Sequence, residues 1–215
     1  MRPLETPRLM LITDRSLSKL PPMQVVRRAL EGGVTTVQLR EKDLDSRNMF
    51  FLASEMRNMT DEYDAGLIIN DRIDIALAVG ADGVHLGKNS MPIMDVRRLL
   101  GRDKLIGFSA HNMQEAVGAE ENGVNYITLS PVYESPGKGE PIGPEAISMV
   151  REGLRIPVIA LGGINADNTA DVLNNKADGI AVVSAIMASD DPKAAAEALR
   201  RVLDSCRPTE QTDPS

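Results

Sequence analysis

Two short peptides in this 215-residue chain carry groups that can bind phosphate. The first, Gln38–Lys42 (QLREK), places a carboxamide, a guanidinium and an ammonium group at alternate positions after a short apolar run. If the strand period of two continues, these side chains project the same way, and two cations there suit a diphosphate. The second, Ala160–Ile164 (ALGGI), has two glycines whose backbone N–H groups can approach a phosphate because no Cβ intervenes. Together the peptides predict one pocket that holds two phosphorylated groups.

Other polar residues stand near the ends of predicted strands, and each has a structural as well as a functional interpretation. Asp71, in the segment Asn70-Asp71-Arg72, either caps the next helix or binds Mg²⁺ beside a diphosphate. His85 lies within one predicted strand and His111 follows another, and the chain has only these two histidines. A lone histidine is more often structural than catalytic, but both fall where we expect a site. All three are therefore candidates for the same pocket.

The loops after the last three predicted strands complete this candidate pocket. The loop 130–143 (SPVYESPGKGEPIG) is long, polar and rich in Gly and Pro. It is either an inert excursion or a mobile lid that carries Lys138 over bound phosphates. Gly162-Gly163 and Val183-Ser184 follow the last two predicted strands, where many barrels bind phosphate through backbone N–H groups and a helix N-terminus. We therefore expect a phosphate between these two loops.

Composition limits the classes of protein to which the chain can belong. Its length suits one large domain, and 42% hydrophobic residues supply a sizeable core. A net charge of −7 argues against broad binding to nucleic acid or to anionic membranes. The single Cys206 excludes an intramolecular disulfide and fits a reducing compartment, and without a long apolar stretch we expect a cytoplasmic protein. We expect residues 1–205 to form the domain and 206–215 to form a polar tail.

Short apolar runs alternate with amphipathic segments eight times, which predicts a single (β/α)8 TIM barrel. Two echoes at about half-chain spacing support a barrel of two similar halves: ADGV at 81–84 with ADGI at 177–180, and EGGVTTVQL at 31–39 with ENGVNYITL at 121–129. The alternative, an open doubly wound sheet, usually has a glycine-rich first turn, which Thr13-Asp14-Arg15 lacks. The predicted strands are Leu9–Thr13, Thr36–Leu39, Gly66–Asn70, Gly83–Leu86, Leu105–Ser109, Tyr126–Ser130, Pro157–Leu161 and Gly179–Ser184. The predicted helices lie near 21–31, 45–62, 72–80, 92–100, 112–122, 143–153, 166–174 and 192–205.

Six segments, in this order and spacing, resemble the thiamine-phosphate synthases and the related thiazole tautomerases: VQLREK, INDR, GADGVHLG, GFSAH, ALGGI and GIAVVSAI. The resemblance covers nearly the whole chain, from Leu11 to Ile186. It implies a Mg²⁺-dependent barrel enzyme, in a family that suggests dimers, which couples hydroxymethylpyrimidine diphosphate with a thiazole phosphate to give thiamine phosphate and pyrophosphate. Synthase chemistry is dissociative: the diphosphate leaves, the pyrimidine carries the cation, and the thiazole nitrogen captures it.

The resemblance also implies roles for individual residues. Gln38 and His85 would hold the pyrimidine, Asp71 would bind Mg²⁺, and Ser135 would supply a hydroxyl from the loop that carries Lys138. Two further sets of residues would bind the phosphates. The diphosphate would be bound by Arg40, Lys42, Asn70, Ser109 and Lys138. The thiazole phosphate would be bound by Gly162, Gly163, Val183 and Ser184.

Two departures from the synthase pattern keep a second function open. Ser90 stands where synthases carry a second Mg²⁺-binding Asp, and Gly137 stands where their loop has a Thr. Both departures favour the tautomerase branch, in which His111 would move protons. The diphosphate-binding set of Gln38, Arg40, Lys42 and Asp71 favours the synthase instead, because a tautomerase does not need it. A third interpretation, a non-catalytic sensor of thiamine intermediates, does not account for the retained site residues.

Overall fold

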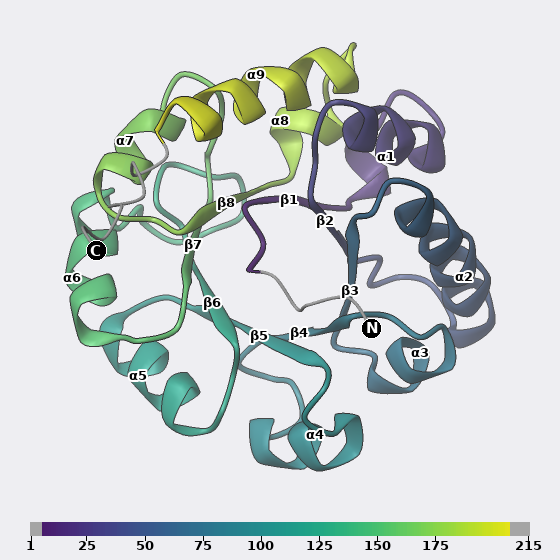
Figure 1. The fold of residues 1–215 in the computed structure, drawn as a ribbon, viewed down its shortest axis with the longest axis horizontal. Helices are drawn as coiled ribbons and strands as arrows, with labels where there is room; N and C mark the ends of the chain where they lie inside the picture. Colours follow the sequence, from purple (N-terminus) through teal and green to yellow (C-terminus); the bar gives the residue numbers. More distant parts are fainter. Residues whose placement is uncertain (1–5, 207–215) are drawn as a thin grey trace, which may run out of the picture.

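The structure is a computed structural model that describes residues 6–206, and these form a closed barrel of eight parallel strands (Figure 1). Each strand pairs with its neighbours in chain order, and β8 pairs with β1 to close the barrel. The predicted (β/α)8 barrel is therefore confirmed. The strands are β1 (Leu9–Ile12), β2 (Thr36–Leu39), β3 (Gly66–Asn70), β4 (Gly83–Leu86), β5 (Leu105–Ala110), β6 (Tyr126–Leu129), β7 (Val158–Leu161) and β8 (Gly179–Val182).

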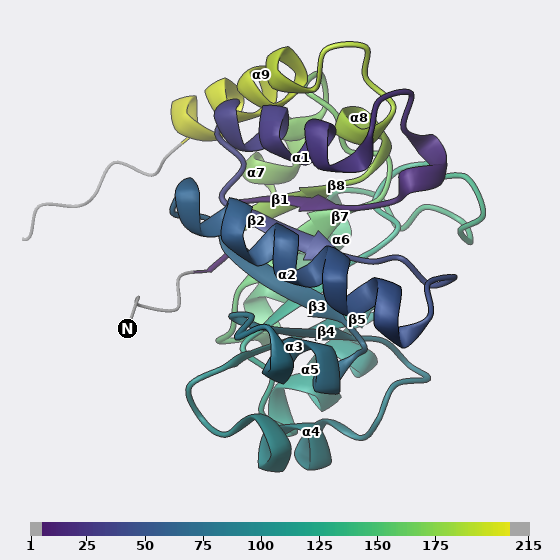
Figure 2. The ribbon, with the colours of Figure 1, turned by 90° about the vertical axis from the view of Figure 1, so that its right-hand side faces the viewer.

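Helices surround the barrel, as the side view in Figure 2 shows. Two short helices were not predicted: a 3-10 turn, η1 (Arg15–Leu17), after β1, and α8 after β8. The predicted eighth strand ran to Ser184, but β8 ends at Val182 and Ser184 begins α8, because β-branched composition alone does not mark where strand pairing stops. The helices are α1 (Pro22–Glu31), α2 (Ser46–Glu62), α3 (Ile73–Ala78), α4 (Ile93–Leu100), α5 (Met113–Glu121), α6 (Glu145–Gly153), α7 (Thr169–Asn174), α8 (Ser184–Met187) and α9 (Pro192–Ser205). No helix within residues 6–206 is long and apolar enough to cross a membrane.

The strands are buried on both faces, which explains their nearly continuous apolar sequences. Outward-facing residues such as Val37 and Leu39 belong to the large core between barrel and helices. The barrel interior has a small apolar core of its own, formed by Met10, Ile12, Ile68, Leu105, Tyr126, Ile159 and Ala181. This interior core separates the two ends of the barrel, so chemistry at one end does not extend to the other.

A fourfold repeat of side-chain hydrogen bonds secures the amino ends of the strands. A polar residue just before each even-numbered strand accepts the backbone N–H at or near the start of the preceding odd-numbered strand. The pairs are Thr35 with Leu9 (3.1 Å), Asp82 with Leu67 (2.7 Å), Asn125 with Ile106 (2.8 Å) and Asp178 with Val158 (2.8 Å). Three of these acceptors also contact an arginine of the preceding even-numbered helix: Arg57, Arg97 or Arg151. The ADG echo in the sequence thus marks two equivalent stabilising corners of the barrel.

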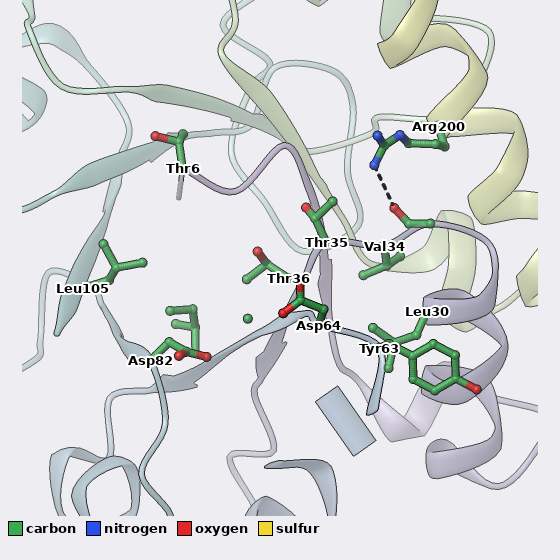
Figure 3. Close-up of a pocket in the computed structure, with 13 residues that line it drawn as sticks. Thr6, Leu30, Val34, Thr35, Thr36, Tyr63, Asp64, Asp82, Leu105 and Arg200 are labelled. Atoms are coloured by element: carbon green, nitrogen blue, oxygen red, sulfur yellow. Dashed lines mark hydrogen bonds between the residues drawn. The ribbon is translucent and has the colours of Figure 1, made fainter. Parts of the chain in front are cut away.

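A hollow of about 380 Å³ lies at this amino end, and Figure 3 shows residues that line it. Thr36 and Leu105, which begin β2 and β5, line it together with Asp82 and Arg200. None of the candidate site residues lines this hollow. In barrels of this type the amino end contributes stability, whereas the loops at the carboxyl ends carry the chemistry.

Candidate active site

Strand register brings the predicted site residues together at the carboxyl end of the barrel. Asn70 of β3 lies beside His85 of β4, which lies beside Gly107 of β5. Ser109 of β5 lies beside Thr128 of β6. Because alternate residues of a barrel strand point inward, this register makes one continuous polar floor from residues that are distant in sequence.

Three cations gather above this floor. Arg40 and Lys42 follow β2, and the Arg40 N–H is held by the Thr13 hydroxyl at 3.0 Å. Lys138 comes from the long loop between β6 and α6, and its pKa is lowered by partial burial and then by the positive charges of Arg40 and Lys42. A hollow of about 530 Å³, lined by Arg40 and Lys42, opens beside the segment after β1. Positive charges gathered this closely form a site that a bound polyanion stabilises.

Glu41, between the two cations in sequence, does not neutralise them. Its side chain is buried and accepts the Arg15 N–H at 3.2 Å, and a carboxylate oxygen lies 3.8 Å from Arg15 Nη1. Glu41 thus joins the segment after β2 to the segment after β1. Sequence analysis gave Glu41 no role, because its partner lies 26 residues away.

The floor is a buried cluster centred on His85. Its Nδ1 lies 3.2 Å from the Tyr126 hydroxyl, and its Nε2 lies 2.9 Å from Ser109 Oγ and 3.4 Å from Thr128 Oγ1. Burial, and to a smaller degree Arg40, lowers the pKa of His85 to about 3, so the ring is neutral. Burial also raises the pKa of Tyr126, which therefore stays a phenol. Tyr126 and Thr128 were not among the predicted site residues, although their alternate positions in β6 mark them as facing inward with Ser130.

Gln38 lies deeper in the barrel than we predicted from its peptide. It is 1% exposed, and its Nε2 lies 3.6 Å from the Met10 sulfur. β2 ends at Leu39, so the strand period does not continue to Arg40 and Lys42. The prediction that all three side chains project the same way rested on a longer strand.

Asp71 lies at the carboxyl end of β3 in a conformation that is unusual for a residue with a side chain. Its φ is +66°, and its N–H donates to the His85 carbonyl at 3.0 Å. It does not cap the next helix, since the N-cap of α3 is Arg72, so the capping interpretation is wrong. A strained backbone that leaves a carboxylate exposed at the carboxyl end of a barrel strand is typical of a functional position.

Ser90 follows β4 on the same side of the barrel. Its Oγ accepts the Gly87 N–H at 2.8 Å and so closes its own turn. Within residues 6–206, no group of three or more His, Cys, Asp or Glu side chains is arranged to hold a metal ion. Because residue 90 is a serine, this position supplies no second carboxylate to complement Asp71.

The glycine pair after β7 serves the packing of a loop. Gly162 and Gly163 have φ values of +99° and +65°, and a Cβ on either would lie within 2.7 Å of the backbone of residues 131–134. We attributed the missing Cβ atoms to an approaching phosphate, but the β6–α6 loop fills that space. This loop is held there by the Tyr133 N–H, which donates to the Gly162 carbonyl at 3.0 Å.

Backbone N–H groups are nevertheless available between the last two loops. The N–H groups of Gly163, Ser184 and Ala185 donate to no other group of residues 6–206. Asn168, which sequence analysis missed, fixes this region, because its Nδ2 donates to the Gly163 carbonyl at 2.9 Å. Val183 precedes α8 without a side-chain cap on that helix. The two loops thus present amides that an anion can accept.

Comparison with known proteins decides the family. The model of the family described as "Thiamine monophosphate synthase" matches residues 9–186, which include all eight strands and every candidate site residue. The chain belongs to this family. The resemblance seen in the motifs is therefore confirmed.

Members of the thiamine monophosphate synthase family with high similarity include proteins from distant organisms. A thiamine-phosphate synthase of Chloroflexus aurantiacus is 45% identical over 91% of this chain and 92% of its own. A thiamine-phosphate synthase of Clostridium novyi is 45% identical over 91% of this chain and 98% of its own. The solved structure of a thiamine phosphate pyrophosphorylase from Pyrococcus furiosus is 41% identical, with a TM-score of 0.87 over 93% of this chain and 96% of that one.

His111, the residue that would serve a tautomerase, lies apart from the buried cluster. Its Nδ1 is 2.7 Å from the Ser130 carbonyl, to which it can only donate, so the neutral ring carries its proton on Nδ1. The Glu115 carboxylate accepts the His111 N–H at 2.9 Å and fixes the backbone. Nε2 is then left as an unprotonated acceptor on an exposed ring.

Proposed function

We propose that this chain is a thiamine-phosphate synthase, which couples hydroxymethylpyrimidine diphosphate with a thiazole phosphate. The observation that carries the proposal is the convergence of Arg40, Lys42 and Lys138 above a neutral, buried polar floor. Such a site suits a reaction in which a diphosphate departs and a planar heterocycle remains. The names of the relatives that are 41–48% identical support this reaction.

In the proposed mechanism the protein stabilises the leaving group. The bond between the pyrimidine methylene carbon and the diphosphate oxygen breaks, and its electron pair leaves with the diphosphate. Arg40, Lys42 and Lys138 bind the charge that grows on that oxygen and its phosphates, with Asn70 and Ser109 as neutral donors. The thiazole nitrogen then forms a bond to the cationic methylene carbon. No side chain is needed as a nucleophile, because the rate enhancement comes from positioning the two substrates and from electrostatic stabilisation of the leaving diphosphate.

The floor orients the pyrimidine. The buried Gln38 amide is neutral and can form hydrogen bonds with a ring nitrogen or the amino group. The His85 ring, whose two nitrogens contact Tyr126 and Ser109, is also neutral and does not oppose the positive charge that develops on the pyrimidine. A protonated His85 would repel that cation, and burial of its ring prevents this. We assign the thiazole phosphate to the free amides of Gly163 and Ser184, which follow β7 and β8.

Mg²⁺ is the cofactor that the family resemblance implies, and the site offers one carboxylate of the kind that binds it. Mg²⁺ is commonly held by one or two carboxylates together with substrate phosphates and water. Asp71 offers one exposed carboxylate at the carboxyl end of β3, and the diphosphate would supply the remaining anionic oxygens. Bound there, the ion would neutralise charge on the leaving diphosphate. The lid residue Ser135, whose carbonyl accepts the Lys138 N–H at 3.1 Å, helps to shape the loop that carries Lys138.

The test is incubation of the wild-type chain with both substrates and Mg²⁺, with thiamine phosphate as the readout. Lys42→Ala and Asp71→Ala should each lower kcat by about 10²-fold, because each acts on charge that grows in the transition state. Binding of the thiazole phosphate should change far less. The matched control is Lys176→Ala, which removes an exposed lysine before β8, at the opposite end of the barrel. If neither Lys42→Ala nor Asp71→Ala alters turnover, these residues are not part of the mechanism.

A thiazole tautomerase is the second candidate, and the geometry of His111 favours it. An exposed imidazole whose Nε2 is left unprotonated can accept a proton from a substrate. The same assay separates the two functions when the thiazole isomer is offered alone. Isomerisation that depends on His111, without any thiamine phosphate from the coupled substrates, would establish the tautomerase. Turnover of either kind excludes a non-catalytic sensor.

A further inference from the structure

A buried chain of hydrogen-bonding groups connects Tyr126, deep in the barrel, to Ser109 at the mouth. Tyr126 is 1% exposed and His85 is 3% exposed, whereas Ser109 is only partly buried. The distances are 3.2 Å from the Tyr126 hydroxyl to His85 Nδ1 and 2.9 Å from His85 Nε2 to Ser109 Oγ. The three residues come from three consecutive strands, and they form one path from the interior to the proposed diphosphate site.

The direction of the hydrogen bonds follows from the number of donors. Within residues 6–206, His85 Nδ1 is the hydroxyl's hydrogen-bond partner. If Nδ1 carried the proton, the hydroxyl hydrogen of Tyr126 would be buried without an acceptor, which is costly. Tyr126 therefore donates to Nδ1, and the neutral ring of His85 carries its proton on Nε2.

The tautomer of His85 determines the hydrogen bonding of Ser109. Its Oγ accepts from His85 Nε2, and it also lies 3.5 Å from Thr128 Oγ1, which is placed to donate to it. With both lone pairs of the oxygen engaged, the hydroxyl hydrogen of Ser109 has to find an acceptor elsewhere. The mouth of the barrel, where the diphosphate is proposed to lie, is the side that remains.

Gly107 makes this arrangement possible. A Cβ at this position would lie 2.4 Å from the Tyr126 hydroxyl and 2.5 Å from His85 Nδ1. Any residue other than glycine at position 107 would therefore push the rings of Tyr126 and His85 apart. The glycine leaves space for this one hydrogen bond.

We propose that Tyr126 is a positioning residue, which acts through His85 to keep the hydroxyl hydrogen of Ser109 directed at the departing diphosphate. The proposal rests on the proposed synthase function for the identity of the anion. The tautomer of His85 on which it depends can be measured without any substrate.

The first test is the ¹⁵N spectrum of histidine-labelled protein, which is simple because the chain has two histidines. A His111→Asn variant assigns the signals. We expect wild-type His85 to be protonated on Nε2, and Tyr126→Phe to let both tautomers populate, so that the two ring nitrogen shifts move toward each other. Tyr63→Phe is the matched control, since this partly exposed tyrosine follows α2, its hydroxyl contacts Arg27, and its loss should leave the His85 signals unchanged.

The second test is a double-mutant cycle in the coupling assay. Tyr126→Phe should lower kcat by about tenfold, and Ser109→Ala by about 10²-fold, because each weakens a donor to the leaving group. In the Ser109→Ala background, Tyr126→Phe should cost less than about twofold, because the two act as a unit. KM for the thiazole phosphate should change little in all three variants.

Protonation of wild-type His85 on Nδ1 would overturn the proposal, and so would additive losses in the double variant. A wild-type chain that makes no thiamine phosphate would refute the synthase function instead, and the spectrum would still decide the tautomer.

Discussion

Replacing Gly107 with alanine places a methyl group between two buried rings at the floor of the site. The new Cβ would lie 2.2 Å from Tyr126 Cζ and 2.5 Å from His85 Nδ1. Carbon atoms in contact prefer about 3.5–4.0 Å, so at least one ring has to withdraw by more than about 1 Å. Neither ring has space to do so, because both residues are almost fully buried.

The cost has two parts. Overpacking of a filled interior typically costs about 1–3 kcal/mol, and loss of the hydrogen bond between Tyr126 and His85 adds about 0.5–1.5 kcal/mol. The free energy of unfolding should therefore fall by about 2–4 kcal/mol. For a domain of this size each kcal/mol lowers Tm by about 2–4 °C, so Gly107→Ala should melt roughly 5–15 °C below wild type. Thermal unfolding followed by circular dichroism measures this directly.

Two companion variants make the result interpretable. Gly118→Ala in α5 is the control, because a Cβ there meets nothing within 4 Å and alanine favours a helix. Tyr126→Leu in the Gly107→Ala background removes the atoms that the new methyl group contacts. The double variant should then lose less stability than the sum of the two single variants. An unchanged Tm for Gly107→Ala, or strictly additive losses, would refute the packing that we describe.

Three further predictions concern the cations, the metal and the amino end of the barrel. Since partial burial, and then the charges of Arg40 and Lys42, lower the pKa of Lys138, synthase activity should fall as pH rises through that lowered pKa. Lys138→Arg should move the fall to higher pH, and identical pH profiles would contradict this. Ser90→Asp should lower the Mg²⁺ concentration needed for half-maximal rate, because a second carboxylate strengthens a hard-cation site; an unchanged requirement would place Ser90 outside it. Asp178→Ala should lower the free energy of unfolding, measured by urea denaturation, by about 1–3 kcal/mol, because the Val158 N–H and Arg151 both lose a partner. The kcat of this variant should stay within about twofold of wild type. A large loss of kcat at full stability would contradict a purely structural role.

Much of the site could be predicted because the relevant signals are local. Strand ends at Leu39 and Leu161 follow from short apolar runs, and the cations and glycines directly after them are visible in the sequence. The rule that barrel chemistry lies at the carboxyl ends of strands then places these residues at one end of the barrel. The half-chain echo at Asp82 and Asp178 was also visible, although its meaning was not.

Pairings between distant residues could not be predicted in this way. His85 and Tyr126 are 41 residues apart, and only the register of β4, β5 and β6 shows that their side chains meet over Gly107. Gly162 was attributed to a phosphate because the sequence does not reveal that residues 131–134 occupy the space beside it.

The sequence by itself thus determined the alternation of elements, the strand ends and the chemical types at the mouth of the barrel, because period and turn chemistry act over a few residues. Only the tertiary structure decided which of those groups touch, which are buried and which way their hydrogen bonds run. Closure of the barrel brings strands from all parts of the chain into one register, and burial then fixes the protonation of His85 and Tyr126.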